Sequence, residues 1–294
     1  MYDELRSPFS VVWAREAGFG AKSLMRLQKA GLMVESGRKL RLLDFPPEKV
    51  ATTAVGPVVA LGHRSAADWY GWPLLHPPSA IELVVPRRRC PTPWPGARIT
   101  RTQLHSSEIV RIRDVPVTKP MRTAVGLALH LPVPDALAVL DGACRLGGVP
   151  AGQLRRELKT LGPKGALIAD LVNPARASVY ESLFFFLMYK AVMPMPRCQF
   201  EVRRGMVLIA RADFAWVKRR VIVEIDGFKY HSDRAAFQED RRRQNALVNA
   251  GWRVLRFTTA DLLLRPDKVI AEVRAALRLP LPKINAAMIK VSAA

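Results

Sequence analysis

Two strand-like runs in the last third of the chain carry three carboxylates that could act together. The run "RVIVEID" alternates β-branched residues with Glu224 and Asp226, and the run "VLIARADFAWV" carries Asp213. Both runs have the two-residue period of strands, with Lys218 and Arg219 between them. If those two basic residues form the loop of an antiparallel hairpin, paired positions sum to 437 and Asp213 lies opposite Glu224. Asp226 then shares their face of the sheet.

Three unpaired carboxylates on one half-buried face repel each other and resist desolvation unless cations or protons neutralise them. Mg²⁺ suits such a site, because it binds carboxylate oxygens and can activate water for attack on a phosphodiester; Mn²⁺ is the alternative ion. Structural ion pairs with neighbouring arginines are the competing explanation. We therefore expect Asp213, Glu224 and Asp226 to be catalytic residues that bind the metal.

A further carboxylate stands at the start of a predicted helix before this hairpin. Ser178 precedes the apolar run "VYESLFFFLMYKAVM", and Glu181 follows three residues later. This spacing is typical of a capping box, in which the glutamate accepts a hydrogen bond from a free backbone N–H. The other interpretation is that Glu181 is presented to the metal site as an additional catalytic carboxylate. The local sequence leaves both interpretations open.

Three more candidate catalytic residues follow the hairpin. His231 comes just after the second strand, where it could act as a general base near neutral pH. In the next predicted helix Asp240, Arg243 and Leu247 share one face, so Leu247 could anchor that face while Arg243 stabilises phosphate charge. Asp240 could orient Arg243 or His231, and an ordinary exposed helix pair is the alternative. With the strand "GWRVLRFTT", the predicted order is helix, hairpin, helix, strand.

The N-terminal residues predict a winged helix-turn-helix. Two short amphipathic runs, "VVWAREAG" and "AKSLMRLQKAG", precede the alternating run "LMVESGRKLRLLD", in which Gly37 occupies the turn of a hairpin. A basic helix face and the wing could contact DNA, although basic helix faces are often simply solvated. The candidate DNA-binding residues are Lys22, Arg26, Lys29, Arg38 and Lys39.

Charge and composition favour a soluble nucleic-acid-binding protein. The 294 residues include 46 Lys and Arg against 25 Asp and Glu, a net charge of +21 that attracts polyanions. Residues 175–294 alone carry 22 basic and 11 acidic side chains. Without an apolar run long enough to span a bilayer, a membrane partner is not expected. The three scattered cysteines and the absence of a secretory h-region indicate a cytoplasmic location.

The same patterns predict three domains in an α/β chain that is α+β overall. We expect a winged helix at 1–48, a mixed middle domain at 49–171 and a nuclease-like domain at 172–294, in which helices flank a mixed sheet. A homodimer would suit a winged helix that reads a palindrome, but no sequence pattern supports one.

The last third resembles the very-short-patch-repair (Vsr)-like endonuclease domains of the PD-(D/E)XK nuclease superfamily. The similar motifs are "SVYES", "RADFAW", "VEIDGFKYH" and "DRRRQNALVNAGWRVLRF", in that order. The resemblance implies a restriction-endonuclease fold and a Mg²⁺-dependent endonuclease that cleaves DNA. In that family's pattern Asp213 and Glu224 hold Mg²⁺, Glu181 adds a carboxylate, and His231, Asp240 and Arg243 complete the site. Much of the superfamily has a lysine where this chain has Asp226.

Residues 9–130 resemble the winged-helix region and following domain of AbiEi-type antitoxin proteins, which are transcriptional regulators. The motifs are "FGAKSLMRLQKAGLMVESGRKLRLL", "LGHRSAADWYGWPLL" and "VPVTKPMRTAVGLAL". This resemblance keeps a second function open, a non-enzymatic regulator whose nuclease fold is catalytically silent because the lysine is absent. RNA is a further alternative substrate.

Overall fold

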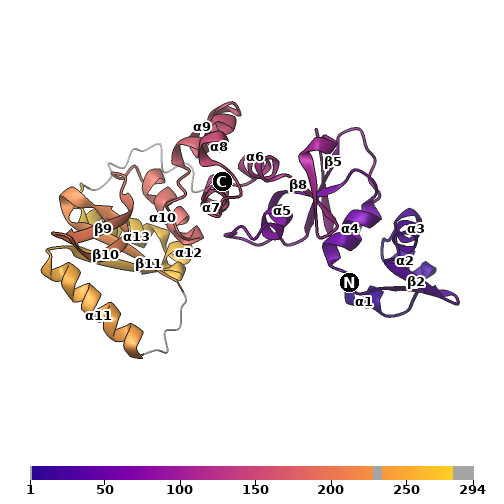
Figure 1. The fold of residues 1–294 in the computed structure, drawn as a ribbon, viewed down its shortest axis with the longest axis horizontal. Coiled ribbons are helices and arrows are strands. Elements are labelled where there is room, and N and C mark those ends of the chain that lie inside the picture. The colour runs from indigo at the N-terminus through magenta and orange to yellow at the C-terminus, as the bar shows by residue number, and fades with distance from the viewer. Residues whose placement is uncertain (1, 228–233, 281–294) are drawn as a thin grey trace, which may run out of the picture. The chain divides into compact units, whose positions relative to one another are not determined.

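The computed structural model describes residues 2–227 and 234–280, and the chain divides into two compact units (Figure 1). The units are Met1–Pro174 and Ala175–Ala294, so the division lies three residues after the start of 172–294. Both units mix helices with sheets, in agreement with the predicted fold class. Within the described residues, no helix combines the length and the apolar character needed to cross a bilayer.

The first unit opens with a small three-stranded sheet and three short helices. Its strand order is β1-β3-β2, with both pairings antiparallel. Ser10 caps α2, since its Oγ accepts a hydrogen bond from the Trp13 N–H at 3.1 Å. Gly37 turns the hairpin at φ 63°, a conformation that glycine adopts without strain. The predicted helix, helix and hairpin are all confirmed. The elements are α1 (Tyr2–Arg6), β1 (Phe9–Ser10), α2 (Val11–Glu16), α3 (Ala21–Lys29), β2 (Met33–Ser36) and β3 (Lys39–Leu42).

The rest of the first unit is a five-stranded mixed sheet with helices, in the order β6-β5-β4-β8-β7. One hydrophobic core runs from Leu5 through Phe19 to Val117, so the N-terminal elements and this sheet pack together. The ring of Phe19 lies 4.8 Å from that of Trp94 within this core. The elements are α4 (Pro47–Val55), β4 (Ala60–Leu61), α5 (His63–Trp69), β5 (Ile81–Pro86), β6 (Ala97–Thr102), η1 (Ser106–Glu108), β7 (Ile109–Ile112), β8 (Val115–Thr118), α6 (Pro120–His130), α7 (Val133–Arg145), α8 (Ala151–Lys159) and α9 (Gly162–Leu171).

The second unit is a four-stranded sheet flanked by helices, in the strand order β12-β11-β10-β9. Strands β9, β10 and β11 pair antiparallel, whereas β11 and β12 are parallel and are joined through α11. The predicted order of helix, hairpin, helix and strand is confirmed, and β9 is an additional strand. The elements are α10 (Val179–Lys190), β9 (Arg197–Arg204), β10 (Val207–Trp216), η2 (Val217–Arg219), β11 (Val221–Asp226), α11 (Arg234–Asn249), β12 (Arg253–Thr258), α12 (Thr259–Leu264) and α13 (Pro266–Ala276).

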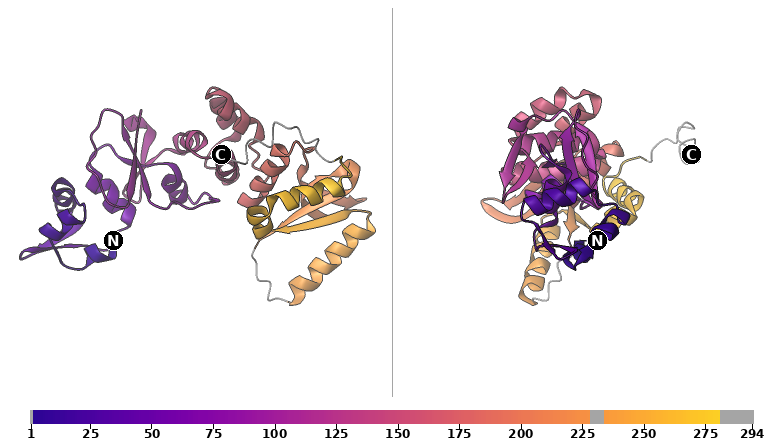
Figure 2. Two further views of the ribbon diagram at one scale, coloured as in Figure 1. Left: turned by 180° about the vertical axis from the view of Figure 1, so that it is seen from behind. Right: turned by 90° about the vertical axis from the view of Figure 1, so that its right-hand side faces the viewer.

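Helices pack on both faces of this sheet (Figure 2). On one face, Leu247 of α11 is fully buried in a cluster with Ile222 and Trp252, as the predicted anchoring role requires. On the other face, the ring of Phe184 in α10 lies 4.7 Å from that of Phe214. Burial on both faces explains why β11 is almost continuously apolar and why a carboxylate within it needs partners.

Candidate active site

Polar side chains from four elements meet in the second unit: Glu181 of α10, Gln199 of β9, Asp213 of β10 and Glu224 of β11. The amide of Gln199 contacts both the Glu181 and the Asp213 carboxylates, and the charges of Asp213 and Glu224 act on each other. We call these four residues the carboxylate cluster. Glu181 and Glu224 are each 4% exposed, so their charges depend on protein partners for solvation.

The hairpin register places Asp213 beside Glu224 as predicted. Beyond the last observed pair, the Asp213 carboxylate takes the place of a backbone carbonyl as the acceptor, because its Oδ2 accepts a hydrogen bond from the Ile225 N–H at 2.8 Å. The predicted two-residue loop is wrong: Val217–Arg219 form a 3₁₀ turn, and Arg220 closes it in the left-handed region at φ 54°. The longer turn leaves the register unchanged. The observed pairs, which each sum to 437, are Phe214–Val223, Ala215–Ile222 and Trp216–Val221.

Glu181 is both a helix cap and a member of the carboxylate cluster. Ser178 Oγ accepts the Glu181 N–H at 3.1 Å, as a capping serine does. In return, Glu181 Oε2 accepts the N–H of Ala177 at 2.9 Å, one residue before the usual position in a capping box. The same oxygen accepts a hydrogen bond from Gln199 Nε2 at 2.9 Å. The two interpretations from the sequence are therefore compatible.

Gln199 is a member of the cluster that the sequence did not reveal. Its Nε2 donates to Glu181 at 2.9 Å and to Asp213 at 3.3 Å, so one neutral amide separates two carboxylates that would otherwise repel each other. Gln199 lies within β9 at φ 48°, a left-handed conformation that is strained for a residue with a side chain. A glutamine in an alternating strand carries no motif, and only the pairing of β9 with β10 brings it to Asp213.

Glu224 is neutralised by two arginines. Arg243 of α11 pairs with Glu224 Oε1, and Arg256 of β12 donates from Nε to Oε2 at 3.1 Å. The parallel register places Arg256 directly beside Glu224. The sequence pattern predicted that Arg243 stabilises phosphate charge, and it did not identify Arg256. These contacts are structural ion pairs with arginines, which were the predicted alternative to a metal.

Burial dominates the protonation of both central carboxyl groups. Desolvation raises the pKa of Asp213, and the nearby charge of Glu181 adds to the increase, while the hydrogen bonds from Ile225 and Gln199 oppose it. Desolvation also raises the pKa of Glu224, although Arg243 and Arg256 oppose the increase. Raised pKa values in neighbouring carboxyl groups are a recurring property of catalytic sites, and structural ion-pair networks produce them too.

The other predicted catalytic residues do not join the cluster in the described part of the chain. Asp226 is exposed at the end of β11, and its side chain forms no ion pair with any described residue. Its carboxylate is accessible to solvent at the end of the strand. His231 lies outside the described residues, as does the side chain of Asp240, although the backbone of Asp240 belongs to α11. Their predicted roles remain predictions.

The cluster supplies the donor atoms that suit a hard divalent cation. Carboxylate oxygens are the donors that Mg²⁺ prefers, and Asp213 and Glu224 supply them from adjacent strands. Within residues 2–227 and 234–280, no three His, Cys, Asp or Glu side chains are grouped to hold a metal. Arg243 Nε is buried and lacks a hydrogen-bond partner among the described residues, so this region retains an unused donor.

The candidate DNA-binding residues of the first unit occupy two kinds of position. Lys22, Lys29, Arg38 and Lys39 are exposed on α3 and the β2–β3 hairpin. In contrast, Arg26 Nη1 donates to the carbonyl oxygens of residues 54 and 55 at 2.9 and 3.0 Å and to the hydroxyl of residue 92 at 3.0 Å. Arg26 therefore joins α3 to the end of α4, a contact that competes with binding phosphate.

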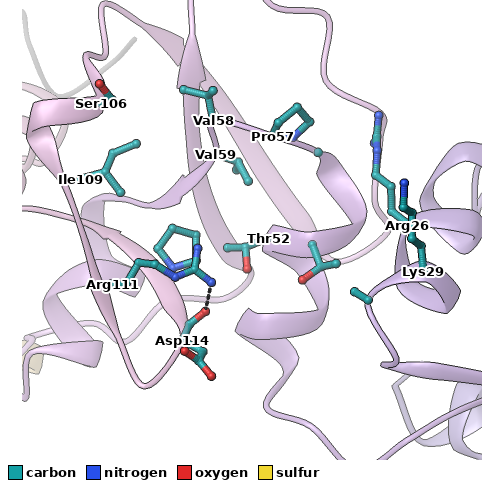
Figure 3. Close-up of a pocket in the computed structure, with 14 residues that line it drawn as sticks. Arg26, Lys29, Thr52, Pro57, Val58, Val59, Ser106, Ile109, Arg111 and Asp114 are labelled. Atoms are coloured by element: carbon teal, nitrogen blue, oxygen red, sulfur yellow. Dashed lines mark hydrogen bonds between the residues drawn. The ribbon is translucent and has the colours of Figure 1, made fainter.

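A pocket of about 750 Å³ lies beside α3 in this unit (Figure 3). Arg26 and Lys29 line one side, and Arg111 and Asp114 line the other, where Arg111 Nη2 donates to the Asp114 carbonyl at 2.8 Å. The volume is in the range of small-molecule sites. Two of its charged side chains already have partners, since Arg26 binds carbonyls and Asp114 pairs with Lys49 at 3.7 Å.

Residues 199–277 match the model of a restriction-endonuclease-like family, REase_MTES_1575. The match contains Gln199, Asp213 and Glu224 but not Glu181. The second unit thus includes a restriction-endonuclease-like domain of the PD-(D/E)XK type. Folds of this type generally use divalent metals, and a nuclease-like family implies DNA binding.

Two proteins of Mycobacterium tuberculosis are similar to the chain over 190 residues, at 27% identity. They are the uncharacterized protein MT2308 of strain CDC 1551 / Oshkosh and the uncharacterized protein Rv2248 of strain ATCC 25618 / H37Rv. The aligned region covers 61% of this chain and 70% of each relative. The crystal structure of the RV2827C protein from Mycobacterium tuberculosis aligns with 53% of this chain and 67% of that chain, at 17% identity and a TM-score of 0.34.

Proposed function

We propose that this chain is a cytoplasmic DNA-binding protein whose second unit is a Mg²⁺-dependent endonuclease that hydrolyses DNA phosphodiester bonds. The observation that carries the proposal is the carboxylate cluster, in which Glu181 and Glu224 are buried and of which three members lie within the region that matches a restriction-endonuclease-like family. Buried carboxylates with raised pKa values beside unused donor groups suit the binding of a metal and a phosphate.

In this proposal Asp213 and Glu224 hold Mg²⁺, and Glu181 supplies a third carboxylate through its contact with Gln199. A bound divalent ion would activate water and neutralise charge at the phosphodiester; Mn²⁺ could replace Mg²⁺. Gln199 fixes the orientation of the Asp213 carboxylate, since its amide holds Oδ1 while the Ile225 N–H holds Oδ2. His231 and Asp226 keep their proposed roles as general base and additional ligand.

Arg243 is suited to phosphate. Its guanidinium lies against Glu224, its side chain is 35% exposed, and its Nε has no partner among the described residues. A phosphate oxygen would satisfy that donor, and charge-assisted hydrogen bonds of this kind are among the stronger ones in proteins. Arg256 would keep one Glu224 oxygen oriented through its 3.1 Å contact. Asp240 would orient Arg243 from the preceding turn of α11.

The first unit would bind DNA as an AbiEi-like winged helix. It would contact the phosphate backbone independently of sequence and would also contact the groove. The exposed side chains Lys22 and Lys29 lie on α3, and Arg38 and Lys39 lie on the hairpin that follows it. A helix followed by a basic hairpin suits a duplex, with the helix in the major groove and the hairpin at the backbone.

A second candidate function is a non-enzymatic DNA-binding regulator with a silent nuclease fold. The specific observation in its favour is that arginines engage both oxygens of Glu224, while Asp226 stands exposed where the superfamily often has lysine. In this alternative Arg243 and Arg256 permanently replace the metal as the counter-charge of Glu224.

Nicking of supercoiled plasmid separates the two candidates. The endonuclease predicts nicking by the full chain with Mg²⁺ or Mn²⁺, and its loss in Asp213→Asn and Glu224→Gln. Glu272→Gln, which changes an exposed glutamate on α13, is the matched control and should nick normally. If the full chain binds duplex DNA but does not nick plasmid with either Mg²⁺ or Mn²⁺, the result supports the regulator. Competition between duplex DNA and structured RNA identifies the preferred nucleic acid.

A further inference from the structure

Two neighbouring hollows in the second unit are lined by basic side chains. The larger, of about 820 Å³, lies between β9, β10 and the end of α11, and the smaller, of about 380 Å³, lies at the start of β11 and β12. Arg220 lines both hollows. Six cations that line one or both hollows and have no carboxylate partner among the described residues form what we call the basic surface: Arg204, Lys218, Arg219, Arg220, Arg253 and Arg278.

The fold gathers these cations from separate parts of the chain. The parallel register pairs Val221 with Arg253, so the turn before β11 and the start of β12 lie at the same end of the sheet. The Arg253 N–H donates to the Arg220 carbonyl at 2.8 Å and fixes the two segments together. Arg204 comes from the end of β9, and Arg278 follows α13. Four segments thus contribute cations to the lining of the two hollows.

Arg220 is held in place at the centre of the basic surface. Its backbone is left-handed at φ 54°, its Nη1 donates to the Ala250 carbonyl at 3.1 Å, and its guanidinium lies 5.5 Å from the centre of the Trp252 ring. A left-handed conformation is strained for a residue with a side chain and often occurs at functional positions.

Among the described residues, no carboxylate provides a counter-charge to the basic surface. No described carboxylate lines either hollow, and the side chains of Lys218, Arg219, Arg253 and Arg278 form no ion pair with any described residue. Arg203, which lines the larger hollow, has a carboxylate partner in Glu201 at 2.8 Å. Elsewhere in this unit, partly buried cations such as Arg256 pair with carboxylates. An anion from outside the chain is the missing partner.

We propose that the basic surface binds the phosphate backbone of duplex DNA. Five of its six cations are arginines, whose planar guanidinium groups match phosphate oxygens in pairs. Several cations spread over two hollows that share Arg220 suit a polymer of regularly spaced phosphates better than a single small anion. The choice of DNA rests on the proposed function, but this binding needs neither metal nor catalysis.

The basic surface is distinct from the carboxylate cluster. Val221 lines the smaller hollow, and Glu224 lies three residues, or about 10 Å, further along β11. None of the six cations contacts Glu181, Gln199, Asp213 or Glu224 through any described side-chain interaction. Substitutions at the basic surface can therefore test DNA binding without touching the proposed metal ligands.

The test is the salt dependence of DNA binding by the full chain with EDTA present. Fluorescence anisotropy with a labelled duplex gives the slope of log Kobs against log salt. The triple variant Lys218→Ala, Arg219→Ala, Arg253→Ala should have a slope smaller in magnitude by about 2.7, because each lost phosphate contact removes about 0.9. The matched control replaces three other exposed cations of the same unit and should keep the wild-type slope: Lys190→Ala, Arg211→Ala and Arg265→Ala.

The outcomes separate this inference from the proposed nuclease. An unchanged slope in the test variant, or an equal change in the control variant, overturns the basic surface as a DNA site, provided that both variants unfold at the wild-type temperature. A loss of binding to phosphatidylserine vesicles with an unchanged DNA slope would also overturn it, in favour of a membrane surface. If the slope falls as expected while wild type never nicks plasmid, the basic surface stands and only the endonuclease fails.

Discussion

Replacing Arg256 by methionine would remove one of the two guanidinium groups that neutralise the buried carboxylate of Glu224. The side chain of Glu224 is 5% exposed and that of Arg256 is 27% exposed, so the pair is largely withdrawn from water. Breaking a buried pair by removing one partner costs roughly 3 to 5 kcal/mol, and since Arg243 remains on the other oxygen we expect about 2 kcal/mol. The length of the methionine side chain preserves most of the packing.

The cost of Arg256→Met should depend on pH. Burial already raises the pKa of Glu224, and losing Arg256 removes one of the charges that oppose this increase. A carboxyl group with a raised pKa in the folded state contributes stability below its unfolded pKa, about 4.3 for glutamate, and loses it as pH rises through the folded pKa. The deficit of the variant should therefore be largest at neutral pH and should shrink on acidification towards about pH 4.

Native-state hydrogen exchange of the β11 and β12 amides measures this cost locally in the full chain. Arg256→Met should lower their opening free energy, whereas Arg253→Met, an exposed arginine on the same strand, should leave it within about 0.5 kcal/mol. In a double-mutant cycle with Glu224→Gln, the two substitutions should couple by about 1 kcal/mol, because the carboxylate that Arg256 neutralises is gone.

Two results would refute this reasoning. The first is an equal cost of Arg256→Met in wild type and in the Glu224→Gln background, which would mean that Arg256 stabilises the sheet through packing alone. The second is a deficit that does not shrink on acidification, which would mean that Glu224 stays charged without its partner. If the ion pairs are as described, Arg256→Met should also bind Mg²⁺ more tightly by calorimetry, since one Glu224 oxygen becomes available.

Three further predictions concern other groups. Gln199→Ala should lower kcat for plasmid nicking about tenfold with little change in KM, because Asp213 loses a charge-assisted hydrogen bond worth about 1.5 kcal/mol; steady-state kinetics checks the split. Glu181→Gln should keep the thermal stability of the wild type but lose nicking, whereas Glu181→Ala should also lose about 1 kcal/mol with its cap contact; calorimetry and the nicking assay separate these roles. Burial lowers the pKa of His63 from 6.5 to about 4. The first unit should therefore lose about 3 kcal/mol of stability as pH falls from 6.5 to about 4, since the unfolded chain binds that proton first; exchange of the α5 amides measures it.

Local patterns in the sequence determined much of the second unit. The two-residue period of the apolar positions fixed β10 and β11 and their register, because a slip by one residue would turn the apolar set away from the core. Ser178 and Glu181 marked the start of α10, since capping is an interaction between residues three apart. The two-residue period of the strands also predicted that Asp213 and Glu224 lie side by side.

The partners of those carboxylates were decided by tertiary structure. Arg256 reaches Glu224 only because β12 joins β11 in a parallel register, a long-range pairing that no turn residue specifies. Gln199 reaches Asp213 only through the pairing of β9 and a left-handed backbone at Gln199 itself. Charge was readable from the sequence, whereas which cation neutralises which buried carboxylate depends on distances across strands that local patterns do not encode.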